Sequence, residues 1–145
     1  MVPLTMKKIV ERILAIAGIT FEEFHKKRFL RVKNAGYMDL CIDYLGIENK
    51  CNKYAVAQNY IQNGDVMKDP DMQFYSIESL DQWWAGSFEQ DGCPQISQFS
   101  ILFDGENFRI NRKLQKQQQS FSNVWSRNLH MQGFDTINKE AISFS

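Results

Sequence analysis

Three aspartates lie close together in one short polar segment, residues 62–72, and they are the side chains of this chain best suited to holding a cation. Asp65, Asp69 and Asp71 supply carboxylate oxygens, which hard cations such as Mg²⁺ and Ca²⁺ prefer. The segment also contains an Asn-Gly pair and an Asp-Pro pair, both typical of turns. Its spacing is not that of an EF-hand loop, and no distal glutamate completes one. We therefore interpret it as a loop between two strands, with a metal site as the alternative.

The histidines and cysteines form no recognisable catalytic or metal-binding pattern. His25 and His130 lie at opposite ends of the chain, so nothing in their spacing requires them to meet. The three cysteines are widely spaced and form no CxxC pair, which favours reduced thiols in a cytoplasmic protein: Cys41, Cys51 and Cys93. A GxSxG elbow and a glycine-rich phosphate loop are both absent from the sequence. We predict no catalytic residue and no cofactor, and a binding protein rather than an enzyme.

Two adjacent tryptophans, Trp83 and Trp84, fall in a segment with the character of a strand. Neighbouring residues of a strand point to opposite faces of a sheet, so one can pack in the core while the other is exposed. An exposed tryptophan is the kind of residue that dominates protein interfaces. We treat the pair as a candidate aromatic anchor, with core packing as the alternative for each.

Charge is distributed unevenly although the whole chain is neutral. Residues 1–34 carry eight Lys/Arg and three Glu, and residues 107–145 carry six Lys/Arg and two acids. Between them, residues 35–106 carry three Lys and twelve Asp/Glu, a net charge of −9. An acidic middle that stays exposed after folding would repel nucleic acid and attract a basic protein surface.

The order of the predicted elements argues for an α+β fold. A helix over residues 4–17 and a short helix opened by a Thr20/Glu23 capping box come first. Alternating patterns then predict strands at 29–33, 37–45, 54–61, 72–76, 83–90 and 95–103, with a helical turn at 77–82. A long helix over 111–132 follows, with an apolar stripe of Leu114, Phe121, Val124, Trp125 and Leu129 and a polar face at 115–119. Gly133 and Phe134 end it.

These elements predict one α+β domain, residues 1–136, and a C-terminal tail, 137–145, that frays or docks loosely. We expect an antiparallel sheet of about five or six strands, packed with the N-terminal helix pair and the long C-terminal helix. Helices on one face would leave the other face of the sheet open to a partner. In the strand over 37–45, Asp39 and Asp43 alternate with apolar residues, which predicts a wet face.

Parts of the chain resemble an uncharacterised domain family carried by bacterial phages, plasmids and conjugative elements. The stretch YMDLCID begins at Tyr37, the stretch QNGDVMKDPDM runs from Gln62 to Met72, and a Gln-Gly-Phe triplet ends at Phe134. The family shows a similar YMDL strand, a QNGDLM-DPEM segment and a closing QGF. The resemblance covers most of residues 9–134. It implies a mobile-element context and no known reaction, cofactor or catalytic residue.

We therefore expect a non-enzymatic binding protein of a phage or other mobile element, for example an inhibitor of a host defence nuclease of the anti-CRISPR or anti-restriction type. Its acidic face would contact a nucleic-acid-binding host protein through Asp39, Asp43, Asp65, Asp69 and Asp71. We expect neither membrane association nor direct nucleic-acid binding, while homodimerisation through a sheet edge stays open. The alternatives are a metal-binding enzyme or regulatory module using the aspartate loop, and a nucleic-acid accessory factor using the basic ends.

Overall fold

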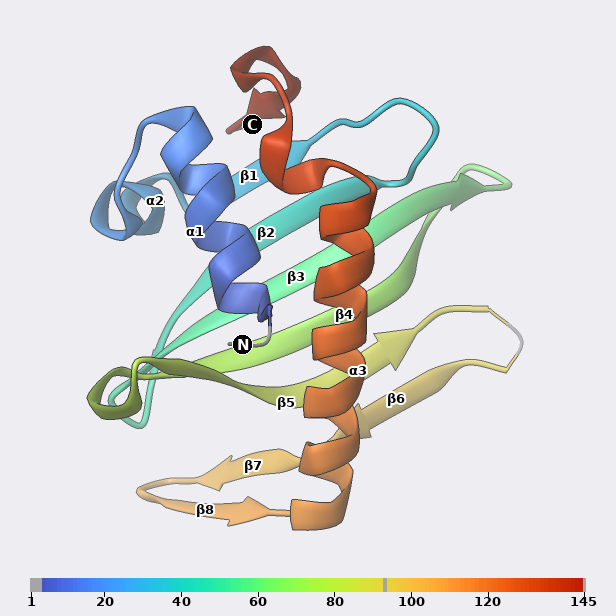
Figure 1. Cartoon of the computed structure of the whole chain (residues 1–145). Coiled ribbons are helices and arrows are strands. Elements are labelled where there is room, and N and C mark those ends of the chain that lie inside the picture. The colour runs from blue at the N-terminus through green and yellow to red at the C-terminus, as the bar shows by residue number, and fades with distance from the viewer. Residues whose placement is uncertain (1–3, 93, 145) are drawn as a thin grey trace.

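The computed structural model describes residues 4–92 and 94–144, in which a seven-stranded antiparallel sheet carries helices on one face (Figure 1). The strands are β1 (Phe29–Val32), β2 (Asp39–Glu48), β3 (Cys51–Gln62), β4 (Asp65–Ile77), β5 (Gln82–Gln90), β6 (Ile96–Phe99), β7 (Ile101–Asp104), β8 (Asn107–Ile110) and β9 (Ile142–Ser143). Their order in the large sheet is β6-β5-β4-β3-β2-β1-β9, and β7 pairs with β8 in a separate two-stranded sheet. The α+β class and the antiparallel pairing are confirmed, although the sheet has more strands than expected.

The N-terminal helices form where the capping residues predict. Thr5 caps α1 (Met6–Ala17), and Gly18, with a φ of 75°, ends it in the left-handed region. Helix α2 (Phe21–Lys27) begins with the predicted capping box, in which Thr20 and Glu23 satisfy each other's backbone N–H groups. Helix α1 crosses the sheet beside α3 (Arg112–Met131), whereas α2 lies toward the β1 and β2 side (Figure 1).

The core lies between the sheet and the helices α1 and α3. Strand residues that alternate along β1 to β5 point to this side and are buried together with the apolar stripe of α1, among them Val32, Leu40, Ile42, Val56, Met72, Phe74, Ile9 and Ile13. Because side chains alternate, the residues between them project from the opposite face of the sheet. We call this the open face. No helix within residues 4–92 and 94–144 is both long and apolar enough to span a membrane.

The predicted apolar stripe of α3 is partly wrong. Trp125 and Leu129 are buried as expected, but Phe121 is 39% exposed and Val124 is 43% exposed. Polar residues take their places on the buried side of the helix: Gln118, Ser122 and Ser126. The reason lies in what the helix covers, since glutamines of its first turns form hydrogen bonds with polar groups of β5, β6 and Ser100.

Glutamines of α3 bond to the edge of β5 at Ala85, where no strand of the described residues pairs with that edge. The N–H of Ala85 donates to Oε1 of Gln119 at 3.0 Å, and Nε2 of Gln115 donates to the carbonyl of Ala85 at 3.2 Å. Nε2 of Gln118 donates to the carbonyl of Gln98 in β6 at 3.0 Å, and Oε1 of Gln118 accepts from the hydroxyl of Ser100. Buried backbone groups must find partners, and side chains here replace a neighbouring strand. The prediction that Gln115 and its neighbours form an outward polar face is therefore wrong for these three.

The C-terminal half of the chain departs from the sequence prediction in two further places. The predicted strand at 95–103 is divided at Ser100, whose N–H donates to the carbonyl of Gly86 at 2.9 Å, so that β7 leaves the sheet and pairs with β8 instead. The C-terminal tail packs on the domain, because Ile142 in β9 pairs with Val32 of β1 at the sheet edge. Within it, Ile137, Ile142 and Phe144 pack against the core.

Candidate functional site

The open face carries a group of carboxylates drawn from three strands. Asp39 and Asp43 project from β2, because the residues that alternate with them are buried against the helices. Asp71 projects from β4, and Glu89 of β5 lies directly opposite it in the register. We call Asp39, Asp43, Asp71 and Glu89 the acidic cluster. The sequence predicted Asp71 in the acidic face with Asp39 and Asp43 but on a loop, whereas it lies in β4. Glu89 is the member of the cluster that the sequence interpretation missed.

Alanines of β3 separate the strands that carry the acidic cluster. Asp43 pairs with Ala55, and Asp71 pairs with Ala57 two residues further along β3. The side chains at these two positions are methyl groups, which are too short to screen the two carboxylates from each other. Asp43 and Asp71 consequently sense each other's charge across the strand.

The ionised form of the Asp43 carboxyl is disfavoured at this position. Burial raises the pKa of the Asp43 carboxyl, the neighbouring Asp71 charge raises it further, and Lys68 lowers it by a smaller amount. Asp43 takes part in no ion pair among the described residues. Asp71 is half satisfied, since Oδ2 lies 3.2 Å from Nζ of Lys68 while Oδ1 is buried without a hydrogen-bond partner in the described part of the chain.

A thiol and a guanidinium lie beside these carboxylates on the open face. Cys41 is buried next to Asp43, and Arg31 of β1 lies opposite Cys41 in the register. Burial raises the pKa of the Cys41 thiol, although Arg31 opposes the shift, so the thiol stays protonated near neutral pH. Its sulfur accepts a hydrogen bond from Nδ2 of Asn59 at 3.3 Å. We assign Cys41 a packing role and Arg31 a place at the margin of the acidic cluster.

The prediction of reduced thiols holds for two of the three cysteines. Cys41 and Cys51 are both free, the first buried and the second partly exposed. Cys93 lies outside the described residues.

The basic ends of the chain form ion pairs with carboxylates that lie outside the acidic cluster. Among the described residues, Lys7 pairs with Asp81, which lies on the turn before β5 and outside the cluster. Arg12 is paired with Asp135, which belongs to the other end. The cluster therefore keeps its negative charge, offset locally by Lys68 and Arg31.

The prediction of a loop over residues 62–72 is wrong. Strands β3 and β4 continue to a two-residue turn, Asn63-Gly64, whose φ values of 53° and 84° suit this dipeptide. Asp65 and Asp69 are thus strand residues, and Asp65 lies about 20 Å along β4 from Asp71 at roughly 3.3 Å per residue. Across the described residues, no three His, Cys, Asp or Glu side chains gather as a metal site would need. The geometry separates Asp65 from Asp71, so the three carboxylates of the metal alternative do not form one group.

The two tryptophans point in opposite directions, as predicted for neighbours in a strand. Trp83 is 6% exposed and stacks on Tyr54 in the core, with ring centroids 4.3 Å apart. Trp84 projects from the open face and lines an apolar cavity between the sheet and the β7–β8 hairpin. Of the two candidate anchors, Trp84 is the one that a ligand could reach. The sequence interpretation missed this cavity because it missed the hairpin, although Asp104-Gly105 between two short apolar runs is a hairpin signal.

Together, the fold and the site define a small α+β domain with a helix-covered sheet and an open face that combines carboxylates with an aromatic cavity. Residues 8–135 match the family model "Domain of unknown function (DUF6908)", and the chain belongs to this family. This agrees with the resemblance to an uncharacterised domain. No curated protein matches the chain. No solved structure matches it either.

Proposed function

We propose that this protein is a non-enzymatic binding protein whose open face engages a basic surface of a protein partner. The observation that carries the proposal is the pair Asp43 and Asp71, which lie on the same face of the sheet on either side of β3 and are incompletely paired. A carboxylate of raised pKa next to a second carboxylate costs stability in the free protein, and such costs concentrate at functional sites. An arginine or lysine from a partner would contact both carboxylates and remove their repulsion.

The charge pattern around this pair supports the same partner chemistry. Asp39 and Glu89 extend the negative charge across the face, and the basic ends of the chain form their ion pairs elsewhere. Phosphate groups would be repelled, whereas a protein surface that grips nucleic acid carries the complementary charge. Arginines of such a surface suit carboxylates well, because the guanidinium can donate two parallel hydrogen bonds.

We extend the proposal to biological context on the sequence resemblance alone. In a phage or another mobile element, a small acidic-faced protein would act by occupying the nucleic-acid-binding surface of a host protein, for example a defence nuclease. Blocking by occupation needs no catalytic residue and no cofactor. The proposal therefore concerns a stoichiometric inhibitor.

The test compares two charge-reversed variants of equal net charge as baits for host-cell proteins. Asp39→Lys/Asp43→Lys alters the acidic cluster, and the lysine introduced on β2 faces Asp71, so the fold should be retained. Glu22→Lys/Glu140→Lys is the matched control, since both of its glutamates are exposed and lie outside the cluster. Wild type and control should retain the same basic protein, in a salt-dependent manner, and the cluster variant should lose it.

The outcome is scored by mass spectrometry of the captured proteins and by thermal midpoints of the three baits. Retention of the same partner by the cluster variant, at an unchanged thermal midpoint, would contradict the proposal. So would capture that is insensitive to salt, or a partner whose contact surface is acidic. A gel shift with duplex and single-stranded DNA should show no binding by wild type.

A further inference from the structure

The cavity beside Trp84 is formed by three parts of the chain that are distant in sequence. Its walls come from β4 and β5, from the turn between β2 and β3, and from the β7–β8 hairpin, and its volume is about 590 Å³. Pockets for small molecules span about 300–1,000 Å³ and are lined mainly by apolar and aromatic side chains. This cavity has both properties.

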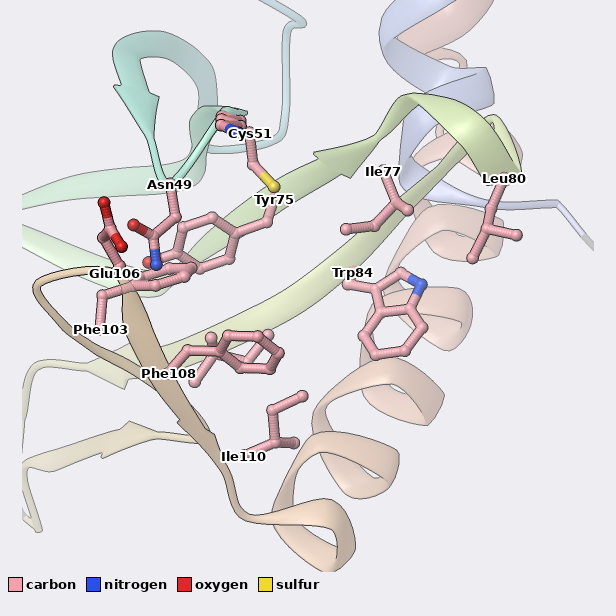
Figure 2. A pocket seen from close by; sticks show the side chains of 12 residues that line it. Asn49, Cys51, Tyr75, Ile77, Leu80, Trp84, Phe103, Glu106, Phe108 and Ile110 are labelled. Carbon is pink, nitrogen blue, oxygen red and sulfur yellow. The ribbon is translucent and has the colours of Figure 1, made fainter.

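Aromatic rings form much of the wall and polar groups gather at one end. Figure 2 shows Asn49, Cys51 and Glu106 near Tyr75 and Phe103 at one end of the cavity, and Leu80, Trp84 and Ile110 toward the other. The rings of Tyr75 and Phe103 meet edge to face, 5.0 Å apart. A ligand that matches this lining has a flat apolar body and polar atoms at one end.

The cavity is held open by packing that does not depend on a ligand. Tyr75 is 5% exposed, and its hydroxyl donates to Oε1 of Glu48 at 3.1 Å, which fixes the ring. Gly86 is required beside it, because a Cβ there would lie 2.7 Å from the Tyr75 ring. The Gly86 carbonyl also accepts the Ser100 N–H, which anchors the chain leading into the hairpin. These contacts preorganise the floor and one wall of the cavity.

The rim of the cavity leaves large apolar side chains in water. Leu80 is 54% exposed and Phe108 is 57% exposed, and both line the cavity. Covering them with an apolar ligand would remove this surface from water, which favours binding. We propose that this cavity is a binding site for a small, planar, largely apolar molecule with one hydrogen-bonding end. The site lies apart from the acidic cluster and does not depend on the proposed function.

Two fluorescent probes test the site in the full chain: the neutral N-phenyl-1-naphthylamine and the anionic 1-anilinonaphthalene-8-sulfonate. At least one should bind saturably at one site per chain, with emission excited by energy transfer from tryptophan. Phe108→Asp should weaken binding about tenfold or more, since it puts a carboxylate in an apolar wall. Phe99→Asp is the control, because Phe99 is also exposed but does not line the cavity.

A second measurement locates the probe on the unaltered protein. Cys51 is a free thiol on the cavity lining, and its sulfur points toward Tyr75 (Figure 2). Saturating probe should slow alkylation of Cys51 by iodoacetamide, as followed by peptide mapping. Asp39→Lys/Asp43→Lys should bind the probes as wild type does. Absence of saturable binding, equal weakening by Phe108→Asp and Phe99→Asp, or unchanged alkylation of Cys51 would each overturn the proposal.

Discussion

The two sides of the sheet differ in how their carboxylates are paired, although Asp135 on the helix side and Asp71 on the open face each keep one buried oxygen without a hydrogen-bond partner among the described residues. On the helix side, Asp135 has a side chain only 1% exposed, and it accepts hydrogen bonds from Nη1 of Arg12 and Nδ1 of His130, both at 2.7 Å. On the open face, Asp43 is partly buried beside Asp71 and lacks an ion pair among the described residues. The comparison indicates that the carboxylate on the helix side is paired for stability, while Asp43 on the open face keeps a charge that no ion pair among the described residues offsets.

Removing a large side chain from each side should give the largest contrast. Phe74→Ala empties a fully buried position under the helices and should cost about 3–5 kcal/mol of unfolding free energy. Its neighbour Gln73 projects from the open face, and Gln73→Ala should cost about 0.5 kcal/mol or less. Urea denaturation of the two variants measures the difference. Similar losses would mean that the open face is covered by structure that contributes to stability.

The glutamines of α3 should matter in proportion to their burial. Gln118 is 3% exposed and bonds to Ser100 and Gln98, so Gln118→Ala should cost about 1–3 kcal/mol by leaving buried groups unpaired. Gln117 is exposed, and alanine there should be neutral or slightly stabilising because alanine favours helices. Chemical denaturation compares the pair. Equal stability of the two variants would show that these hydrogen bonds contribute nothing net.

Asp135 should make the helix side sensitive to acid. Burial acts to raise the pKa of Asp135, but hydrogen bonds from Arg12 and His130 outweigh it, and the net pKa lies below its usual value of 3.8. The stabilisation is therefore present above pH 3.8 and lost as pH falls through the lowered pKa. Asp135→Asn should cost about 1–2 kcal/mol at neutral pH, with a smaller deficit in acid. Thermal midpoints across pH test this, and a deficit that is constant with pH would contradict it.

Asp43 should change stability with pH in the opposite direction to Asp135, and by a smaller amount. Its pKa is raised above 3.8, so the folded protein binds this proton more tightly, and stability is lost as pH rises from 3.8 through the raised pKa. Asp43→Asn should therefore raise stability at neutral pH by up to about 0.5 kcal/mol, because the group is only partly buried. The gain should vanish in acid. Asp65→Asn, at an exposed position, is the control and should change nothing in the same series of thermal midpoints.

Local signals in the sequence predicted much of this fold. The Thr20/Glu23 capping box, the stripe of α1 and the alternation around Asp39 and Asp43 each depend on a few neighbouring residues, and each is found in the structure. The β7–β8 hairpin was within reach of the same reasoning, because the turn-forming segment Asp104-Gly105-Glu106-Asn107 separates Phe103 from Phe108. This part of the fold was therefore predictable from the sequence, although the single strand predicted at 95–103 overlaps both β6 and β7.

Other features depend on contacts that no local pattern contains. The placement of Asp71 on the same face as Asp43 follows from the pairing of three strands, and it depends on register shifts between β2 and β3 and between β3 and β4. The buried glutamines of α3 break the rule that helices bury apolar residues, since they meet a strand edge that only the tertiary fold creates. The two residues of β9 are too few for a periodic pattern.

The hydrogen bonds that Gln115 and Gln119 form with the backbone of Ala85 have a consequence for aggregation. An unpaired strand edge is a template on which another molecule can add a strand, and proteins with such edges commonly cover them. Here the cover is a helix that the chain supplies only after β5 is complete. Weakening the contact of α3 with the sheet would therefore lower stability and would also expose an unpaired strand edge, on which another molecule could add a strand. Gln115→Ala/Gln119→Ala should therefore form oligomers before it unfolds, as size-exclusion chromatography at rising temperature would show.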